Sequence, residues 1–289
     1  MSYTPQSNTS PQVSKLDDDV FIRLRDFIYE KTGIFFAENK KYLLESRVSK
    51  RLAALGLETY SRYFSELMNG RGAMELSHLI NSVTINETFF FRNEPQFKAL
   101  EEIVLPELAE RKMQAGANAI RIWSAACSTG EEAHTIALII REKIRPKYPG
   151  VKFEIVGTDI NTHVLETAAK GVYKDYAVRN IPKNYLGKYF KQDQDKYQLD
   201  QEVAAMSEFR QLNLFDRNMM RTMRNYDVVF AANVLIYFDF KSKQTVVSSI
   251  YDSLNKGGYF FIGYSETLYG LSQAFKPVHF EKTIAYRKE

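Results

Sequence analysis

The sequence has little cysteine, histidine and tryptophan, and it has no long apolar run. Its single cysteine, Cys127, cannot form an internal disulfide, which favours a reducing compartment. No apolar run approaches the roughly 20 residues of a membrane-spanning helix. Residues 1–15 are rich in Ser, Thr, Gln, Asn and Pro and lack the apolar stretch of a signal peptide. We therefore expect a cytoplasmic protein that does not insert directly into a membrane, with a disordered tail over residues 1–15.

The same scarcity argues against several kinds of site. The four histidines are scattered without the spacing of metal ligands, so we predict no metal site. They are His78, His134, His163 and His279. Cys127 has no histidine or cation nearby in the sequence that would activate a nucleophile, which favours a packing role. The net charge of +4 is too small to indicate nucleic-acid binding.

What the sequence does contain is a nucleotide-pocket pattern from Ile120 to Ala133, IRIWSAACSTGEEA. An apolar run, a Ser/Thr/Gly turn and acidic residues that begin a second apolar-periodic segment are typical of a buried strand followed by a helix. A later apolar run, FEIVGTDIN, places Asp159 at the tip of a neighbouring strand, where a carboxylate can accept hydrogen bonds from ribose hydroxyls. Together, the strand–turn–helix pattern and the carboxylate at Asp159 indicate an adenosine-type cofactor.

The glycine count distinguishes between adenosine cofactors. A dinucleotide site requires G-x-G-x-x-G to hold a pyrophosphate, and only Gly130 is present here. Glu131 and Glu132 at the helix start would repel phosphate, but they suit a ligand with an ammonium and a sulfonium, such as S-adenosylmethionine. The alternative is that both glutamates are ordinary first-turn residues favoured by the helix dipole.

The hydrophobic periodicity predicts two domains joined by a linker over residues 85–98. Residues 16–84 have helical patterns and should form a small all-helical domain. Residues 99–289 alternate between helical and strand patterns, which predicts a mostly parallel sheet with helices on both faces. The predicted strands are 120–126, 153–159, 226–232 and 258–264, with an edge strand over 279–287. Polar residues with short β-like pieces over about 176–212 predict a small antiparallel β subdomain inserted in this α/β domain.

The second helix of the all-helical domain carries a basic run. Between residues 40 and 51 five basic residues accompany one acid, Glu45. The basic residues are Lys40, Lys41, Arg47, Lys50 and Arg51. A charge run of this kind is usually a solvated helix face.

The linker contains the segment TINETFFFRN, residues 84–93, with three consecutive phenylalanines. The spacing of its residues alone slightly favours a segment that packs between the two domains over a segment that contacts a ligand. Six motifs then appear in order along residues 17–289: TINETFFFRN, SAACSTGEE, GTDIN, LNLFD, NVLIYFD and GGYFFIGYSETL. In this order the chain resembles the bacterial chemotaxis receptor glutamate O-methyltransferases, the CheR type.

That resemblance implies an all-helical N-terminal domain, a linker, and a Rossmann-like S-adenosylmethionine-dependent methyltransferase domain with a small β subdomain. It also assigns cofactor contacts by motif position. From the linker these are Asn86, Thr88 and Arg92, and from the sheet domain they are Glu132, Asp159, Asn213, Leu214, Ala232 and Asn233. Arg92 and Tyr237 are the expected catalytic residues, with Tyr237 near the departing methyl group. Family members usually carry Arg in place of Ala232, and Pro-Tyr in place of Ala133 and His134.

The implied reaction transfers a methyl group from S-adenosylmethionine to a glutamate side chain, leaving S-adenosylhomocysteine. A glutamate carboxylate is already ionised at pH 7, so no general base is required. The expected partners are the cytoplasmic domains of chemotaxis receptors, contacted by a monomeric enzyme through Arg47, Lys50 and Arg51 of the basic helix. Other readings are a methyltransferase for RNA or a small molecule, and a cofactor-binding scaffold without activity. An NAD-dependent oxidoreductase is disfavoured by the single glycine.

Overall fold

The computed structural model describes residues 15–69 and 72–289. The predicted disordered tail therefore lies outside the described residues except at Lys15. The chain divides into two compact units, residues 1–85 and 86–289, which are described separately below.

The described part of the first unit contains four α-helices and a short 3-10 turn. These are α1 (Asp18–Thr32), η1 (Glu38–Lys40), α2 (Lys41–Leu55), α3 (Tyr60–Met68) and α4 (Gly72–Val83). Helix α1 begins where the Asp17 side chain accepts a hydrogen bond from the Val20 N–H, and it ends at Gly33 with φ of 72°. The core of this unit consists of apolar helix faces that meet around Leu24, Leu44 and Tyr63, all fully buried.

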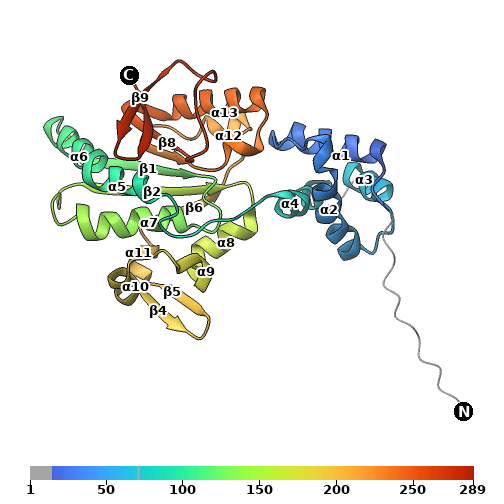
Figure 1. The fold of residues 1–289 in the computed structure, drawn as a ribbon, viewed down its shortest axis with the longest axis horizontal. Coiled ribbons are helices and arrows are strands. Elements are labelled where there is room, and N and C mark those ends of the chain that lie inside the picture. Colours follow the sequence, from blue (N-terminus) through green and yellow to red (C-terminus); the bar gives the residue numbers. More distant parts are fainter. Residues whose placement is uncertain (1–14, 70–71) are drawn as a thin grey trace, which may run out of the picture. The chain divides into compact units, whose positions relative to one another are not determined.

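The second unit is built around a seven-stranded sheet in the order β6-β2-β1-β7-β8-β10-β9 (Figure 1). Its strands are β1 (Ala119–Ala125), β2 (Lys152–Asp159), β6 (Ser207–Gln211), β7 (Tyr226–Ala231), β8 (Leu254–Ile262), β9 (Phe275–Phe280) and β10 (Thr283–Lys288). Strands β6, β2, β1, β7 and β8 are parallel neighbours, whereas β10 is antiparallel to β8 and to β9. The predicted sheet with helices on both faces is confirmed. The single edge strand predicted over 279–287 is wrong, because a turn at 281–282 divides this segment into the β9–β10 hairpin.

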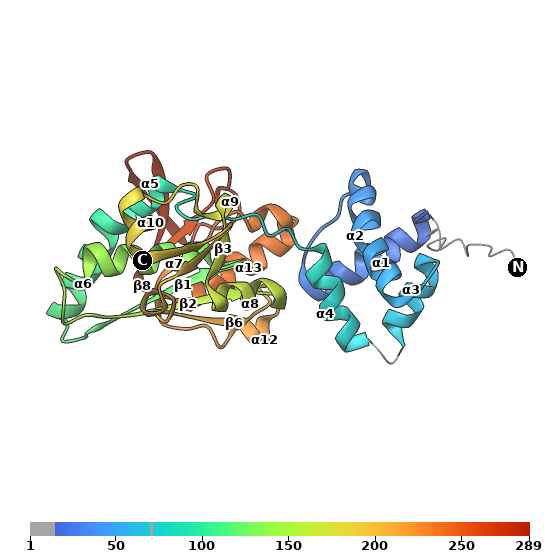
Figure 2. The same ribbon diagram turned by 90° about the horizontal axis from the view of Figure 1, so that it is seen from below.

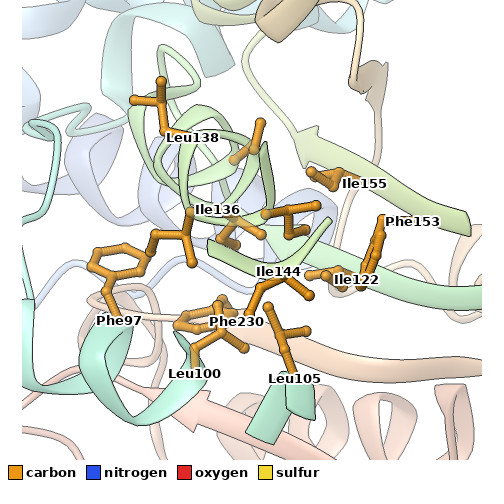
Figure 3. Packing of buried hydrophobic residues seen from close by; sticks show 14 of the residues in the cluster. Phe97, Leu100, Leu105, Ile122, Ile136, Leu138, Ile144, Phe153, Ile155 and Phe230 are labelled. Atoms are coloured by element: carbon orange, nitrogen blue, oxygen red, sulfur yellow. The ribbon is translucent and has the colours of Figure 1, made fainter. Parts of the chain in front are cut away.

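The sheet is covered by helices on both faces (Figure 1). The helices of this unit up to residue 170 are α5 (Glu94–Ala99), α6 (Leu105–Gln114), α7 (Glu131–Ile139) and α8 (Thr162–Lys170), with π-helical turns η2 (Leu100–Val104) and η3 (Ile140–Ile144). After β6 come α12 (Arg217–Met220), η4 (Leu235–Tyr237) and α13 (Phe240–Ser253). Figure 3 shows Phe97, Leu100 and Ile136 packed around Ile122 and Phe230 of the sheet. Successive strand side chains point to opposite faces, so Trp123 and Val229 belong to the other face.

A second, three-stranded antiparallel sheet is inserted after α8, on the α7 side of the large sheet (Figures 1 and 2). It consists of β3 (Val172–Lys174), β4 (Phe190–Asp193) and β5 (Lys196–Leu199), with helices α9 (Asp175–Val178), α10 (Lys183–Tyr189) and α11 (Gln201–Ala204) around it. The predicted antiparallel insertion is therefore present.

The predicted extent of the insertion, about 176–212, is wrong at both ends. Strand β3 starts earlier, at Val172, and the segment FRQLNL does not belong to the small sheet. Strand β6 pairs in parallel with β2 and forms the edge of the large sheet. Strand β6 can lie beside β2 because Gly157 of β2 has no side chain. A Cβ atom at Gly157 would lie only 2.5 Å from the ring of Phe209 in β6.

Candidate functional site

The strand order places the candidate site at the carboxyl ends of the central strands. From β1 the chain passes to β2 on one side, while β7 pairs with β1 on the other side. Ligands of open α/β sheets bind at such a switch point, outside the carboxyl ends of the strands. The loops that follow β1, β2, β6 and β7 carry most of the cofactor residues predicted for the sheet domain.

The loop after β1 has an unusual backbone. Ala126 and Ser128 have φ of 58° and 50°, and Gly130, the residue before α7, has φ of 90°. Non-glycine residues rarely adopt positive φ, and such strain gathers at ligand sites. Gly130 is required sterically as well, since a Cβ atom there would lie 2.7 Å from the Ala168 Cβ.

Asp159 holds this loop against the end of β2. One carboxylate oxygen of Asp159 accepts a hydrogen bond from the Ser128 N–H at 2.9 Å, and the other accepts one from the Asn161 N–H at 2.9 Å. Burial raises the pKa of Asp159, although these backbone donors oppose that shift. A carboxylate has about four lone-pair sites, so Asp159 can still accept a further hydrogen bond. Asp159 thus lies at the tip of β2, the strand position predicted for it, and it also has a structural role that sequence reasoning missed.

Asn213 and Leu214 follow β6 beside Asp159. The Leu212 N–H donates to the Asp159 carbonyl at 2.9 Å and joins the ends of β6 and β2. The Asn213 side chain accepts a hydrogen bond from the Phe215 N–H at 3.0 Å, which fixes the turn. Leu214 is buried. The structure therefore brings these two predicted residues to the Asp159 end of the site.

Glu131 and Glu132 begin α7 and have unusual titration properties. Ser124 Oγ donates to Glu132 Oε1 at 2.7 Å, and Thr129 Oγ1 donates to Glu131 Oε2 at 2.6 Å. Burial raises the pKa of each carboxyl group to about 7, against the effect of these hydroxyl donors. The nearby charge of Arg92 lowers the pKa of Glu132, whereas the nearby charge of Glu266 raises it.

The predicted linker, which we call the strap (residues 85–98), packs against the loop after β1 and against α7. The Asn86 carbonyl accepts a hydrogen bond from Ser128 Oγ at 2.9 Å, and the Phe91 N–H donates to Thr135 Oγ1 at 3.2 Å. Phe90 is fully buried between Tyr173 and Phe190. The packing role considered for the strap is therefore present in Phe90, and the backbone of Asn86 contacts the loop after β1.

Arg92 and Thr88 lie further along the strap. Arg92 Nη1 donates to the Glu87 carbonyl at 2.6 Å, and its guanidinium lies 5.7 Å from the centre of the Phe89 ring. The positive charge of Arg92 is near enough to Glu132 to lower the pKa of that carboxyl group. Thr88 is partly exposed.

The loop after β7 carries Ala232, Asn233 and Tyr237, and it is organised by a residue that sequence reasoning did not assign. Glu266 accepts hydrogen bonds from the N–H groups of Asn233 at 2.8 Å, Gly263 at 2.6 Å and Ile236 at 3.1 Å. Asn233 has φ of 61°. The only sequence signal for Glu266 is its place in the quoted motif GGYFFIGYSETL.

Two groups that could act as a nucleophile or a base are poorly suited to these roles, because the Cys127 thiol stays protonated and the His134 imidazole is a weak base. Burial, and next the charge of Asp159, raise the pKa of the Cys127 thiol well above its usual value. Burial lowers the pKa of His134 to about 4, and this side chain hydrogen-bonds the Ala168 carbonyl at 3.1 Å. The packing role predicted for Cys127 agrees with its burial. Within residues 15–69 and 72–289, no cluster of three or more His, Cys, Asp or Glu side chains could hold a metal ion.

The basic helix α2 of the first unit does not present its charges as the sequence suggested. Arg51 donates two hydrogen bonds to Glu75 at 2.9 and 2.7 Å, and Tyr63 donates a third to Glu75 at 2.8 Å. Arg47 donates to the Val83 carbonyl at the end of α4. Lys50, by contrast, is exposed. Arg51 thus joins α2 to α4. The interpretation of the basic run over residues 40–51 as a solvated helix face is therefore wrong at Arg51.

Comparison with known proteins assigns the family. Residues 86–284 match the model of the CheR methyltransferase SAM-binding domain, and residues 19–84 match that of the CheR methyltransferase all-alpha domain. The chain belongs to the CheR methyltransferase family. It is 38% identical over 274 residues to chemotaxis protein methyltransferase 2 of Vibrio cholerae, covering 94% of each chain. It is 36% identical to chemotaxis protein methyltransferase of Borreliella burgdorferi, covering 87% of this chain and 89% of that one.

Family membership makes the chain an S-adenosylmethionine-dependent methyltransferase with a Rossmann-like catalytic domain, as predicted from the motifs. The boundary between the two family domains, at residues 84–86, coincides with the division of the structure into two units. Among the helices of the described ranges, none has the length and apolar character needed to cross a membrane.

Proposed function

We propose that this CheR-family enzyme methylates glutamate side chains of chemotaxis receptors, forming γ-glutamyl methyl esters. The relatives that it matches over most of its length are named as chemotaxis protein methyltransferases. The observation that carries the proposal is the charge pattern of the site. It combines carboxylates suited to a cationic methyl donor with a thiol, Cys127, that stays protonated and an imidazole, His134, that is a weak base.

The residues at the carboxyl edge fit S-adenosylmethionine. Glu132 is a partly buried carboxylate whose pKa is raised to about 7, so a cation beside it would stabilise its ionised form. Asp159 retains lone pairs that can accept hydrogen bonds from ribose hydroxyls. Asn213 and Leu214 would line the adenine end. Asn86, Thr88 and Arg92 of the strap and Ala232 and Asn233 after β7 would complete the pocket.

Transfer of the methyl group then needs alignment rather than proton transfer. When bound, S-adenosylmethionine supplies an activated methyl group on a positively charged sulfur. An oxygen of the substrate glutamate forms the new bond to the methyl carbon as the carbon–sulfur bond breaks, and the bonding electrons remain on sulfur. The carboxylate and the sulfonium both lose their charge, so exclusion of water favours the reaction.

Arg92 and Tyr237 are the proposed orienting residues for this step. Arg92 can donate to the substrate carboxylate in a planar geometry. Tyr237 lies in η4, directly after the Glu266-anchored part of the loop. A general base is unnecessary because the substrate carboxylate, with a reference pKa near 4.3, is ionised at pH 7.

We further propose that the enzyme acts as a monomer that docks on receptors through the exposed face of α2 that carries Lys50. Lys50 is its main cation there, and Arg47 contributes beside it. Receptor cytoplasmic coiled coils present acidic glutamates, which such a surface would attract. Arg51 would support this surface by fixing α2 to α4 rather than by contacting the receptor.

The direct test uses labelled S-adenosylmethionine, chemoreceptor-containing membranes and mild alkali. Carboxyl methyl esters release methanol under these conditions, whereas methylated nitrogen does not. We expect label on the receptor band that is lost as methanol. Label that resists alkali, or no transfer by an enzyme that binds S-adenosylhomocysteine in calorimetry, would contradict the proposal.

A further inference from the structure

Two loops at the carboxyl edge of the sheet are joined by Glu266. The first follows β7 and contains Asn233 and Ile236, and the second follows β8 and begins at Gly263. Both oxygens of the Glu266 carboxylate are used: Oε2 accepts from Asn233 and Gly263, and Oε1 accepts from Ile236. A Cβ atom at Gly263 would lie 2.6 Å from Glu266 Oε2, so the approach of the two loops depends on this glycine.

The second loop is also anchored at its other end. Leu268 is buried, and its N–H donates to the Tyr286 hydroxyl of β10 at 3.3 Å. Backbone hydrogen bonds from Leu271 and Ser272 to the Leu268 carbonyl close the following turn. The loop is therefore held at Glu266 and at Leu268. Tyr264 and Tyr269 lie next to these two anchored positions in the sequence.

Large apolar side chains extend from these anchored loops into solvent. Tyr264 is 90% exposed, Tyr269 is 92% exposed and Ile236 is 51% exposed. Phe240, the first residue of α13, is also exposed. Single exposed apolar residues are ordinary, but several on two connected loops are typical of an interaction surface. We call Ile236, Phe240, Tyr264 and Tyr269 the aromatic rim.

The location of the aromatic rim indicates its partner. It lies on the loops that follow β7 and β8, and Ile236 directly precedes Tyr237. A glutamate side chain of a protein substrate can reach the site only if the rest of that protein rests outside it. Lys241 and Lys243 follow Phe240 in α13, and Lys241 is exposed, so the rim adjoins positive charge that suits an acidic segment.

We propose that the aromatic rim docks the acidic helical segment of the receptor that carries the methylated glutamate. Tyrosine provides a large, rigid contact surface and a hydroxyl group that can bond to a helix surface. This inference rests on the proposed function. It adds a second contact region on the catalytic unit to the α2 surface of the first unit.

The test compares receptor methylation by wild type and by the double variant Tyr264→Ser with Tyr269→Ser. We expect the receptor KM to rise at least tenfold, with kcat and the Kd for S-adenosylhomocysteine within twofold of wild type. Tyr264→Phe with Tyr269→Phe should retain most of the affinity, because the rings remain. Met113→Ser is the matched control: Met113 is exposed near the end of α6, which precedes the amino end of β1.

The outcomes separate the two proposals. An unchanged KM in the double variant, with active wild type, would overturn the aromatic rim and leave the glutamate methyltransferase function standing. Absence of alkali-labile ester with wild-type enzyme would overturn the function and this inference together. A wild-type dimer in light scattering that the double variant abolishes would assign the rim to self-association and also overturn the proposal.

Discussion

The carboxylate of Asp159 accepts a hydrogen bond from the backbone N–H of Ser128 at 2.9 Å. This bond joins the tip of β2 to the strained loop after β1. It therefore couples the residue proposed to bind ribose with the backbone that shapes the rest of the pocket. Loss of Asp159 would remove a ligand contact and release a loop with two non-glycine residues at positive φ.

Replacement Asp159→Ala should weaken binding of S-adenosylhomocysteine by roughly 30-fold or more, because a hydrogen bond to a charged group contributes about 2 kcal/mol. Calorimetry measures the change. To separate ribose contact from loop anchoring, the same titration is repeated with a ligand analogue that lacks both ribose hydroxyls. If Asp159 binds ribose, wild type should discriminate strongly between the two ligands and the variant should not. Equal discrimination in both proteins would leave only the anchoring role.

Local sequence patterns correctly predicted the strands and helix ends that depend on residues close together in the sequence. The apolar run before SAACSTGEE ends in a turn and an acidic helix start, and β1 and α7 lie within a few residues of the predicted positions. Asp17 and Gly33 likewise mark the ends of α1. The family motifs then identified the cofactor domain, which the family models confirm.

Interactions distant in sequence were not predictable in this way. Strand β6 has a polar, half-exposed sequence, and its place in the large sheet depends on the open edge of β2 about 50 residues earlier. Glu266 reaches Asn233 across 33 residues. Arg51 and Glu75 are 24 residues apart. The ion pair between them could therefore not be predicted from the basic run that contains Arg51.

The binding of S-adenosylhomocysteine and of S-adenosylmethionine should weaken as the pH falls below about 7. Glu132 must be ionised to attract the ligand's ammonium, and burial raises its pKa in the free protein to about 7. A bound cation lowers that pKa, so binding below pH 7 releases a proton. The affinity should fall by up to tenfold per pH unit between about pH 7 and pH 5.

Calorimetry across this pH range, with Glu132→Gln and Glu131→Gln as a matched pair, identifies the responsible carboxyl group. Glu132→Gln should bind weakly and show a flat pH profile. Glu131 has a similarly raised pKa, but its carboxylate already accepts a hydrogen bond from the Thr129 hydroxyl, so Glu131→Gln should retain the pH dependence. A flat profile in Glu131→Gln alone would transfer the role to that residue.

Replacement Tyr237→Phe should lower the single-turnover rate of methyl transfer about tenfold, because the phenol can no longer orient the reacting groups by hydrogen bonding. The Kd for S-adenosylhomocysteine should stay within about twofold. Rapid-quench measurement with excess enzyme and saturating cofactor gives the rate without product release. Tyr264→Phe removes the same hydroxyl from an exposed position and serves as the control. A wild-type rate in Tyr237→Phe would remove this residue from the mechanism.

Replacement Arg51→Ala should destabilise the first unit by roughly 3 kcal/mol, because Glu75 would remain buried without its charged partner. Burial disfavours ionisation of Glu75, but hydrogen bonds from Arg51 and Tyr63 outweigh it and lower its pKa. The only tryptophan, Trp123, lies in the second unit, so its fluorescence does not report on this change. Hydrogen exchange of the α2 and α4 amides measures it directly.

Lys50→Ala provides the contrast that separates stability from docking at the basic helix. Lys50 is exposed, so its removal should change the stability of the first unit by less than about 0.5 kcal/mol. Its receptor KM should nevertheless rise several-fold if α2 contacts an acidic receptor surface, and the increase should shrink at high salt. An unchanged KM in Lys50→Ala, with faster exchange in Arg51→Ala, would show that the basic run serves the fold of the first unit and that receptor recognition resides elsewhere.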